Sequence, residues 1–364
     1  MGDPAAYLEI PKPGGGVETV FILREIELGR ARAARVADRT CGYGEFAPPD
    51  GLASDREIRI AQSAAECFRR SGVREVWADR SLPMVFAAVF AEVGISLRCD
   101  PSLGVLERRS KSESEIEALR AAQATAEQCV RFACEWIAGC EAGAGGALRR
   151  DGGEVTSERV RAEANMWLLR RGAEPCTGAI VAGGAQGGDC HEQGSGALRT
   201  GEPIIVDIWP MNPATRYYGD CTRTVVHGRD GEVPPEVRAM HSAVAAAKKA
   251  AIAAVRAGAS GEAVHGAACG AFRERGYLVG APPEGEQRAG AAYVHGTGHG
   301  VGLDVHEPPL LDEGGPALVD GECVTIEPGL YSASLGGVRI EDMVVARAWG
   351  CENLNSIPET LTWA

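Results

Sequence analysis

The chain has 364 residues, of which 45% are hydrophobic and 24% are charged, as in an ordinary globular protein. Its length exceeds what one hydrophobic core usually serves, so we expect two domains. The formal net charge of -13 argues against a nucleic-acid partner, because phosphate binding relies on clustered lysines and arginines.

No apolar stretch approaches the roughly 20 residues that a membrane-spanning helix needs. The opening segment, Met1 to Gly16, lacks an apolar core like that of a signal peptide. We therefore expect a cytoplasmic protein that does not bind membranes. The cysteines form no Cys-x-x-Cys pair, so we expect them to be reduced and mostly buried.

The first part of the chain alternates between helical and strand patterns. Residues 54–71 and 81–93 are predicted as helices, and residues 73–78 and 95–98 as strands. Such alternation is typical of a small α/β domain, which we assign to residues 1–108. We find no group of residues with catalytic or metal-binding character in it.

The second predicted domain, residues 109–364, combines long helices with apolar strands, an α+β pattern. Ser112 or Ser114 is expected to cap a long amphipathic helix that ends at the glycine cluster beginning with Gly139. Further helices are predicted at 157–171, 235–257 and 261–276. Strands are predicted at 203–209, 217–226, 323–326 and 337–346.

Four carboxylates interrupt the strand-like segments of this second domain. Asp207 lies inside PIIVDIW, Asp220 begins a β-branched segment, Glu327 follows VTI, and Glu341 precedes MVVA. A single buried acid is usually paired with a lysine or arginine, but four converging acids would repel one another strongly. Two divalent cations would offset four negative charges, and carboxylate oxygens suit hard ions. The acids therefore predict a metal centre if their strands converge.

Histidines concentrate in the same domain. The segment HGTGHGVGLDVHE contains His295, His299 and His306, with glycines between them that permit close backbone approach. His191 ends the glycine-rich loop GGAQGGDCH. The remaining histidines are isolated within helix or strand patterns, and we interpret them as structural or surface residues.

Common alternative motifs are missing or incomplete. The sequence has no H-E-x-x-H zinc motif, and GTGHGVG lacks the third glycine of a dinucleotide-binding loop. The serine-hydrolase motif is represented only by a Gly-Ser-Gly run at 194–196 without the required spacing. Carboxylates and histidines around a metal therefore remain the best prediction.

The strongest pattern is the order of the candidate ligands, which are Asp207, Asp220, His299, Glu327 and Glu341. This order resembles the metallopeptidase family that contains methionine aminopeptidases, aminopeptidase P and prolidases. The resemblance covers about Arg109 to Trp363. It implies a catalytic domain with the pita-bread fold over residues 109–364, preceded by a creatinase-like α/β domain over residues 1–108.

The resemblance also implies two divalent metal ions. Asp207 would chelate one ion, Asp220 and Glu341 would bridge the pair, and His299 and Glu327 would bind the other. Manganese is the expected metal, with cobalt, iron(II) or zinc as alternatives. The carboxylate and imidazole ligands suit any of these ions.

Four more residues would surround the substrate by the same resemblance. His191 would lie beside the substrate, and His306 would contact the scissile amide and stabilise the oxyanion. His295 and Arg339, within HxxxH and RIED, are typical of the proline-directed branch, whereas methionine aminopeptidases usually lack the arginine. The resemblance therefore favours Xaa-Pro peptides as substrates and a homodimeric enzyme.

The implied reaction is hydrolysis of the first peptide bond by a hydroxide that bridges the two metals, with Glu327 shuttling the proton. Two features depart from the family pattern: the interval between Asp207 and Asp220 is longer than usual, and Cys190 replaces a common proline. Three alternatives stay open. They are a methionine-type or other aminopeptidase, a non-peptidase hydrolase on this fold, and a binding protein that has lost catalysis.

Overall fold

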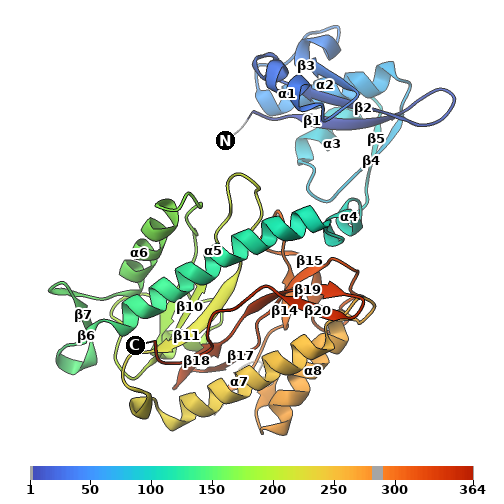
Figure 1. Ribbon diagram of the computed structural model, residues 1–364. Coiled ribbons are helices and arrows are strands. Elements are labelled where there is room, and N and C mark those ends of the chain that lie inside the picture. Colours follow the sequence, from blue (N-terminus) through green and yellow to red (C-terminus); the bar gives the residue numbers. More distant parts are fainter. Residues whose placement is uncertain (1–2, 281–289, 364) are drawn as a thin grey trace. The chain divides into compact units, whose positions relative to one another are not determined.

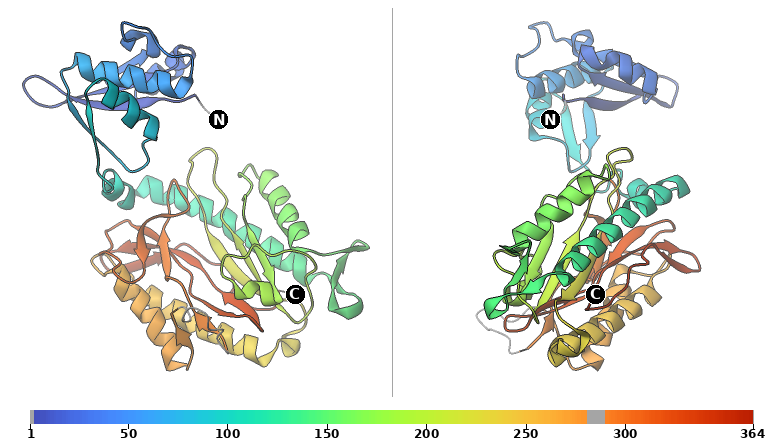
Figure 2. Two further views of the ribbon diagram at one scale, coloured as in Figure 1. Left: turned by 180° about the vertical axis from the view of Figure 1, so that it is seen from behind. Right: turned by 60° about the vertical axis from the view of Figure 1, so that its left-hand side comes forward.

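A computed structural model describes residues 3–280 and 290–363 of the chain, which divides into two units, Met1–Leu106 and Glu107–Ala364. Figures 1 and 2 show both units coloured along the sequence. Within the described residues, no helix is long and apolar enough to cross a bilayer. The cysteines are free, and all except Cys99, Cys190 and Cys351 are buried.

The first unit is built on a three-stranded sheet in the order β1-β2-β3. Its strands are β1 (Ala6–Pro11), β2 (Val17–Leu23), β3 (Arg39–Gly42), β4 (Glu75–Ala78) and β5 (Ser96–Cys99), the last two forming a parallel pair. Its helices are α1 (Leu28–Ala34), α2 (Arg56–Arg70) and α3 (Met84–Glu92). The predicted alternation is present, but the sequence analysis assigned none of the first three strands.

In the second unit, one half packs two helices on a three-stranded antiparallel sheet. The helices are α5 (Glu113–Ala138) and α6 (Ser157–Leu169), and α4 (Val105–Arg109) precedes them. The strands, in the order β11-β10-β9, are β9 (Ile180–Gly183), β10 (Pro203–Ile208) and β11 (Cys221–Val226). As predicted, Ser112 caps α5, where its side chain and that of Glu115 form a capping box.

A small separate sheet belongs to the same half and contains β6 (Glu141–Ala142), β7 (Leu148–Arg150) and β8 (Gly153–Glu154). The apolar faces of α5 and α6 and the strands of the larger sheet form a common core. Burial of this core holds β10 and β11, and with them the first two candidate ligands, in place.

The other half uses α7 (Pro235–Ala254) and α8 (Gly261–Glu274). Its two sheets have the orders β15-β14-β16-β19-β20 and β12-β13-β17-β18. Their strands are β12 (Leu278–Val279), β13 (Ala292–Tyr293), β14 (Gly298–Gly300), β15 (Glu307–Leu311), β16 (Cys323–Ile326), β17 (Gly329–Ser332), β18 (Gly336–Arg339), β19 (Asp342–Arg347) and β20 (Gly350–Asn353). Figure 1 shows the strands of this unit between α5 on one side and α7 on the other.

Two predicted strands are corrected by the structure, and both corrections concern candidate ligands. Residues 337–346 do not form one strand: β18 pairs with β17, β19 pairs with β16, and Glu341 lies at the change of partner. The strand predicted at 217–226 begins only at Cys221, because the backbone N–H of Asp220 is bound by the Gln123 side chain. Both acids therefore lie just outside regular strands.

Candidate metal centre

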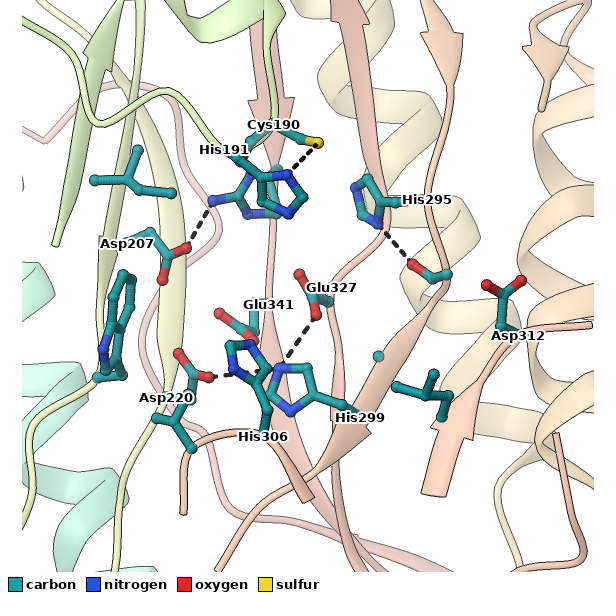
Figure 3. A pocket seen from close by; sticks show the side chains of 17 residues that line it. Cys190, His191, Asp207, Asp220, His295, His299, His306, Asp312, Glu327 and Glu341 are labelled. Carbon is teal, nitrogen blue, oxygen red and sulfur yellow. Dashed lines mark hydrogen bonds and ion pairs between the residues drawn. The ribbon is translucent and has the colours of Figure 1, made fainter. Parts of the chain in front are cut away.

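A pocket of about 390 Å³ opens in the second unit, and every side chain that the sequence analysis selected lines it. These side chains are His191, Asp207, Asp220, His295, His299, His306, Glu327, Arg339 and Glu341. Figure 3 shows Asp207 and Asp220 on one side of the pocket and His295 on the other, with Glu327, Glu341 and His299 between them. The two halves of the unit thus contribute opposite walls.

Antiparallel pairing positions the first two acids. Asp207 stands in β10 opposite Thr222 of β11, two residues beyond Asp220. Gln123 of α5 holds the backbone of Asp220 from both sides: its Oε1 accepts from the Asp220 N–H at 2.7 Å, and its Nε2 donates to the Asp220 carbonyl at 2.7 Å. A buried glutamine that satisfies two backbone groups fixes this turn beside the pocket.

The two glutamates reach the pocket from strand ends in the other half. Glu327 directly follows β16, and its backbone N–H donates to the Thr297 carbonyl at 2.8 Å. Glu341 donates its backbone N–H to the Thr222 carbonyl at 3.1 Å and accepts a hydrogen bond from the Thr222 hydroxyl at 2.8 Å. Thr222 therefore joins the two halves at the site, a role that the sequence analysis missed.

Glycines let the histidine segment pass between neighbouring strands. A Cβ atom on Gly298 would lie 1.9 Å from the Thr325 carbonyl oxygen, and one on Gly300 would lie 2.4 Å from the Pro308 carbonyl oxygen. Real side chains cannot occupy such positions, so the G-H-G sequence is required for this close approach. The arrangement delivers His299 into the pocket.

Three of the predicted ligands come close together. Asp220, His299 and Glu341 each offer an atom that lies within 4.8 Å of the others. The His299 Nε2 atom is 3.8 Å from Asp220 Oδ2 and 3.5 Å from Glu327 Oε1. The arrangement suits a cation, because imidazole nitrogen and carboxylate oxygens meet around one point.

Asp207 differs from the other acids because Arg339 donates a hydrogen bond to its Oδ2 at 2.6 Å. Its buried Oδ1 atom has no hydrogen-bond partner within residues 3–280 and 290–363. A buried carboxylate oxygen without a donor is costly unless a cation occupies the space before it. The Oδ2 atom of Asp207 is thus bound by Arg339, whereas its Oδ1 atom is available as a ligand.

Burial and mutual repulsion disfavour ionising all of these acids at once. Burial, reinforced by the charges of Asp207 and Glu327, raises the pKa of Asp220 well above its usual range. Burial and the charge of Asp220 do the same to the pKa of Glu341, and burial raises the pKa of Glu327 to about 7. Divalent cations would reverse this electrostatic cost, so the residues present fit a metal centre.

His299 is suited to be a neutral ligand. Its Nδ1 atom lies 3.1 Å from the Gly300 carbonyl oxygen, which can only accept, so Nδ1 carries the proton and Nε2 is free. Burial lowers the pKa of His299, which keeps the ring uncharged. His306 is exposed, and the centroid of its ring lies 4.3 Å from the centroid of the His299 ring.

His295 belongs to a hydrogen-bonded chain that ends at Asp207. Its Nδ1 donates to the Gly296 carbonyl at 2.6 Å, so its Nε2 accepts from the Tyr331 hydroxyl at 2.8 Å. Arg339 donates to that hydroxyl at 3.0 Å, and burial together with Arg339 lowers the pKa of His295 to about 4. The sequence analysis did not select Tyr331, because a tyrosine in a strand carries no distinguishing signal.

His191 stands at the exposed edge of the pocket. Its ring Nδ1 is 3.8 Å from the Cys190 sulfur, and its backbone N–H donates to the Asp189 carboxylate at 2.9 Å. The Cys190 carbonyl accepts a hydrogen bond from Arg339 at 3.2 Å. The loop that carries His191 is therefore tied to the buried part of the site.

The sequence profile of Metallopeptidase family M24 matches residues 117–348, which include every candidate site residue. A probable dipeptidase PepE from Mycobacterium bovis is 32% identical over 257 residues, covering 70% of this chain and 60% of the relative. A Xaa-Pro dipeptidase from Pyrococcus furiosus is 30% identical over 255 residues, covering 69% of this chain and 64% of the relative. The alignments thus span less than two thirds of these relatives.

A likeness in three dimensions extends further along the chain than the sequence alignments. A solved structure of a Xaa-Pro dipeptidase from Bacillus anthracis matches with a TM-score of 0.77 at 22% identity. The match covers 96% of this chain and 89% of the other. At this level of identity the comparison shows the fold.

Proposed function

This chain belongs to metallopeptidase family M24, and from this premise we propose that it is an exopeptidase that uses two divalent metal ions to hydrolyse the first peptide bond of its substrate. One observation carries the proposal: Asp220, Glu327 and Glu341 are gathered around a neutral His299 without enough protein cations to balance them. Xaa-Pro peptides are the favoured substrates, because the RIED segment that carries Arg339 resembles that of the proline-directed branch and because a Xaa-Pro dipeptidase is 30% identical to this chain.

The fold supports this function. Two halves, each pairing helices with antiparallel strands, enclose the pocket, and the pita-bread fold predicted from the sequence is confirmed by the likeness to solved dipeptidase structures. In this arrangement the proposed metal ligands come from strands or strand ends in both halves. The site is then held by rigid elements, which favours fixed ligand geometry.

The proposed ligands are Asp207, Asp220, His299, Glu327 and Glu341. Divalent ions bound there would polarise the scissile carbonyl group and lower the pKa of a coordinated water toward neutrality. Arg339 keeps one Asp207 oxygen engaged, which turns the unpartnered Oδ1 toward its role as a ligand. Thr222 orients the Glu341 carboxylate in the same way.

Glu327 is proposed to move the proton from the attacking water to the leaving nitrogen. Its carboxyl group lines the pocket beside His299, where it can contact the attacking water and the leaving nitrogen. The Thr325 hydroxyl lies 3.4 Å from Glu327 Oε1 and restrains the carboxyl group. This pair provides a proton carrier held in one orientation.

The histidines around the metals are proposed to bind and orient the substrate. His306, beside His299, would donate a hydrogen bond to the developing oxyanion. His191 would contact the substrate at the exposed edge. His295 acts as a positioning residue, because Tyr331 connects it to Arg339 and hence to Asp207.

The proposed activity is tested by removing metals from the purified protein, reloading one divalent metal at a time, and measuring hydrolysis of three substrate classes. These are Xaa-Pro dipeptides, longer Xaa-Pro peptides and Met-Ala peptides. We expect metal-dependent cleavage of Xaa-Pro peptides. Cleavage of Met-Ala peptides alone would reject the proline preference, and no cleavage of any peptide would reject the exopeptidase proposal.

Three finer proposals rest on the resemblance of the sequence to its family. We propose manganese as the native metal, a homodimer as the assembly, and the cytoplasm as the location. Elemental analysis of the protein purified without added metal tests the first. Analytical ultracentrifugation tests the second, and fractionation of the source cells tests the third.

A further inference from the structure

His191 stands at one exposed edge of the pocket, and the rest of the lining has a closed end and an open end. At the closed end, Asp207 is 8% exposed, and Ile180, which pairs with it across β9 and β10, is 7% exposed. At the open end, Leu310 is 62% exposed, and the Asp312 side chain is 46% exposed. Figure 3 shows Asp207 and Asp312 on opposite sides of the pocket.

This asymmetry gives the substrate a direction. An exopeptidase acting at the amino terminus holds a single residue before the scissile bond, and a closed end suffices for it. The rest of the peptide can leave through the open end. A path through this end takes the groups that follow the scissile bond past Asp312 and Leu310, which line it.

Asp312 gives the open end a negative charge. Its Oδ1 accepts a hydrogen bond from the Glu313 N–H at 2.8 Å and lies 3.5 Å from His265 Nε2. Burial lowers the pKa of His265, so this ring is neutral near pH 7 and leaves the carboxylate charge in place. Asp312 Oδ2 lies close to Gly296, another residue of the pocket lining: a Cβ atom built on Gly296 would be 3.3 Å from this oxygen.

The pocket lining offers no free lysine or arginine side chain to a substrate carboxylate. Among its lining residues, all within the described part of the chain, Arg339 is the only lysine or arginine. Arg339 already donates to Asp207, Tyr331 and the Cys190 carbonyl. Its bond to Asp207, at 2.6 Å, holds it at the closed end.

We propose that Asp312 determines substrate specificity by disfavouring a free α-carboxylate directly after the scissile bond, so that longer or carboxamide-ended peptides are preferred over dipeptides. The inference deepens the proposed exopeptidase function and rests on it. Two like charges several ångströms apart at a partly solvated site repel by an amount that corresponds to about a tenfold change in rate constant. The effect should appear mainly in KM, because it acts on binding.

The test compares Ala-Pro with its carboxamide, Ala-Pro-NH2, on the metal-loaded protein, using the wild type, Asp312→Asn and Glu313→Gln. Asparagine keeps the shape of Asp312 and can still accept the Glu313 N–H bond. Glu313 is an exposed neighbour outside the pocket lining, so its variant is the matched control. The decisive quantity is the ratio of kcat/KM for the carboxamide to kcat/KM for the free acid.

We expect a wild-type ratio of about 10, an unchanged ratio in Glu313→Gln, and a ratio several-fold lower in Asp312→Asn, chiefly through a lower KM for the acid. An Asp312→Asn ratio equal to that of the wild type overturns the inference. So does an equal loss with both substrates, since Asp312 would then bind the amino terminus or support the fold. Cleavage of neither substrate or of any longer peptide defeats the proposed function, and this inference falls with it.

Discussion

Glu341 and Asp342 are neighbours in sequence and both are buried, yet they lie in opposite electrostatic surroundings. Asp342 receives hydrogen bonds from Arg223 at 2.8 Å, from Lys248, and from Asn353 at 2.9 Å. Although burial raises its pKa, the charges of Arg223 and Lys248 lower the pKa of Asp342 overall. Its charge is balanced within the protein.

Glu341 faces the other way, toward acids. Burial raises the pKa of Glu341 most, the charges of Asp220, Glu327 and Asp207 raise it further, and the Thr222 hydroxyl supplies one hydrogen bond. The comparison separates two uses of a buried carboxylate. One acid stabilises the fold through protein cations, whereas the other lies among acids, which supports its proposed role as a metal ligand.

The largest expected effect is on catalysis and comes from the pocket acids. Glu327→Gln should lower kcat for an Xaa-Pro peptide by about 10²- to 10⁴-fold, because glutamine cannot carry the proton. The thermal midpoint of the metal-free variant should stay close to that of the wild type. The exposed Glu313→Gln serves as the control in both assays. Near-native turnover by Glu327→Gln would remove the proton-transfer role.

The second prediction addresses the two neighbours directly, by urea unfolding of metal-free protein. Asp342→Asn should lower the free energy of unfolding by about 3–5 kcal/mol, because Arg223 and Lys248 lose the charge that compensates them. Glu341→Gln should leave the free energy of unfolding unchanged or raise it, since one of several repelling acids is removed. Equal destabilisation by both variants would show that Glu341 and Asp342 contribute to stability in the same way, contrary to this prediction.

The third prediction concerns metal binding. Manganese added to the metal-free wild type at about a hundredfold excess over its Kd should raise the free energy of unfolding by about 2.7 kcal/mol. Glu341→Gln should lose most of this increment. If this variant were stabilised by manganese as much as the wild type, Glu341 would not be a ligand.

The smallest expected effect is on stability and concerns Glu66, an acid of the first unit that is paired with arginines as Asp342 is. It extends the comparison to the pH dependence of stability. Arg69 and Arg70 bind the Glu66 carboxylate at 2.6 and 2.7 Å, and these bonds, Arg69 first, lower its pKa from 4.5 to about 2. A lowered folded-state pKa stabilises the fold above pH 4.5, and the contribution disappears as the pH falls toward 2.

Because both arginines are partly exposed, Glu66→Gln should cost only about 1 kcal/mol at pH 7. Hydrogen exchange of the α2 amides measures this cost within the full chain. The difference between variant and wild type should shrink between pH 4.5 and pH 2. A difference that did not change over this interval would show that the ion pairs contribute nothing.

The sequence predicted regular elements well where local signals were strong. Ser112, three residues before Glu115, marked the start of α5, and β10 and β16 agree closely with the apolar segments that predicted them. The errors lie where the chain changes partners. Residues 337–346 look like one strand because the segment is rich in valine and isoleucine and contains no turn signal, and only pairing with β17 and then β16 divides it.

The sequence by itself identified the family and its pita-bread fold, through the order of the candidate ligands. It also identified the acids that needed partners, because a carboxylate inside an apolar strand is costly wherever it folds. It could not say how each acid is satisfied. Tertiary structure decided that Asp342 meets Arg223 and Lys248, that Asp207 shares Arg339 with Tyr331, and that Asp220 and Glu341 meet each other. The reason is that a partner's charge comes from elements far apart in sequence, and only packing brings them within range.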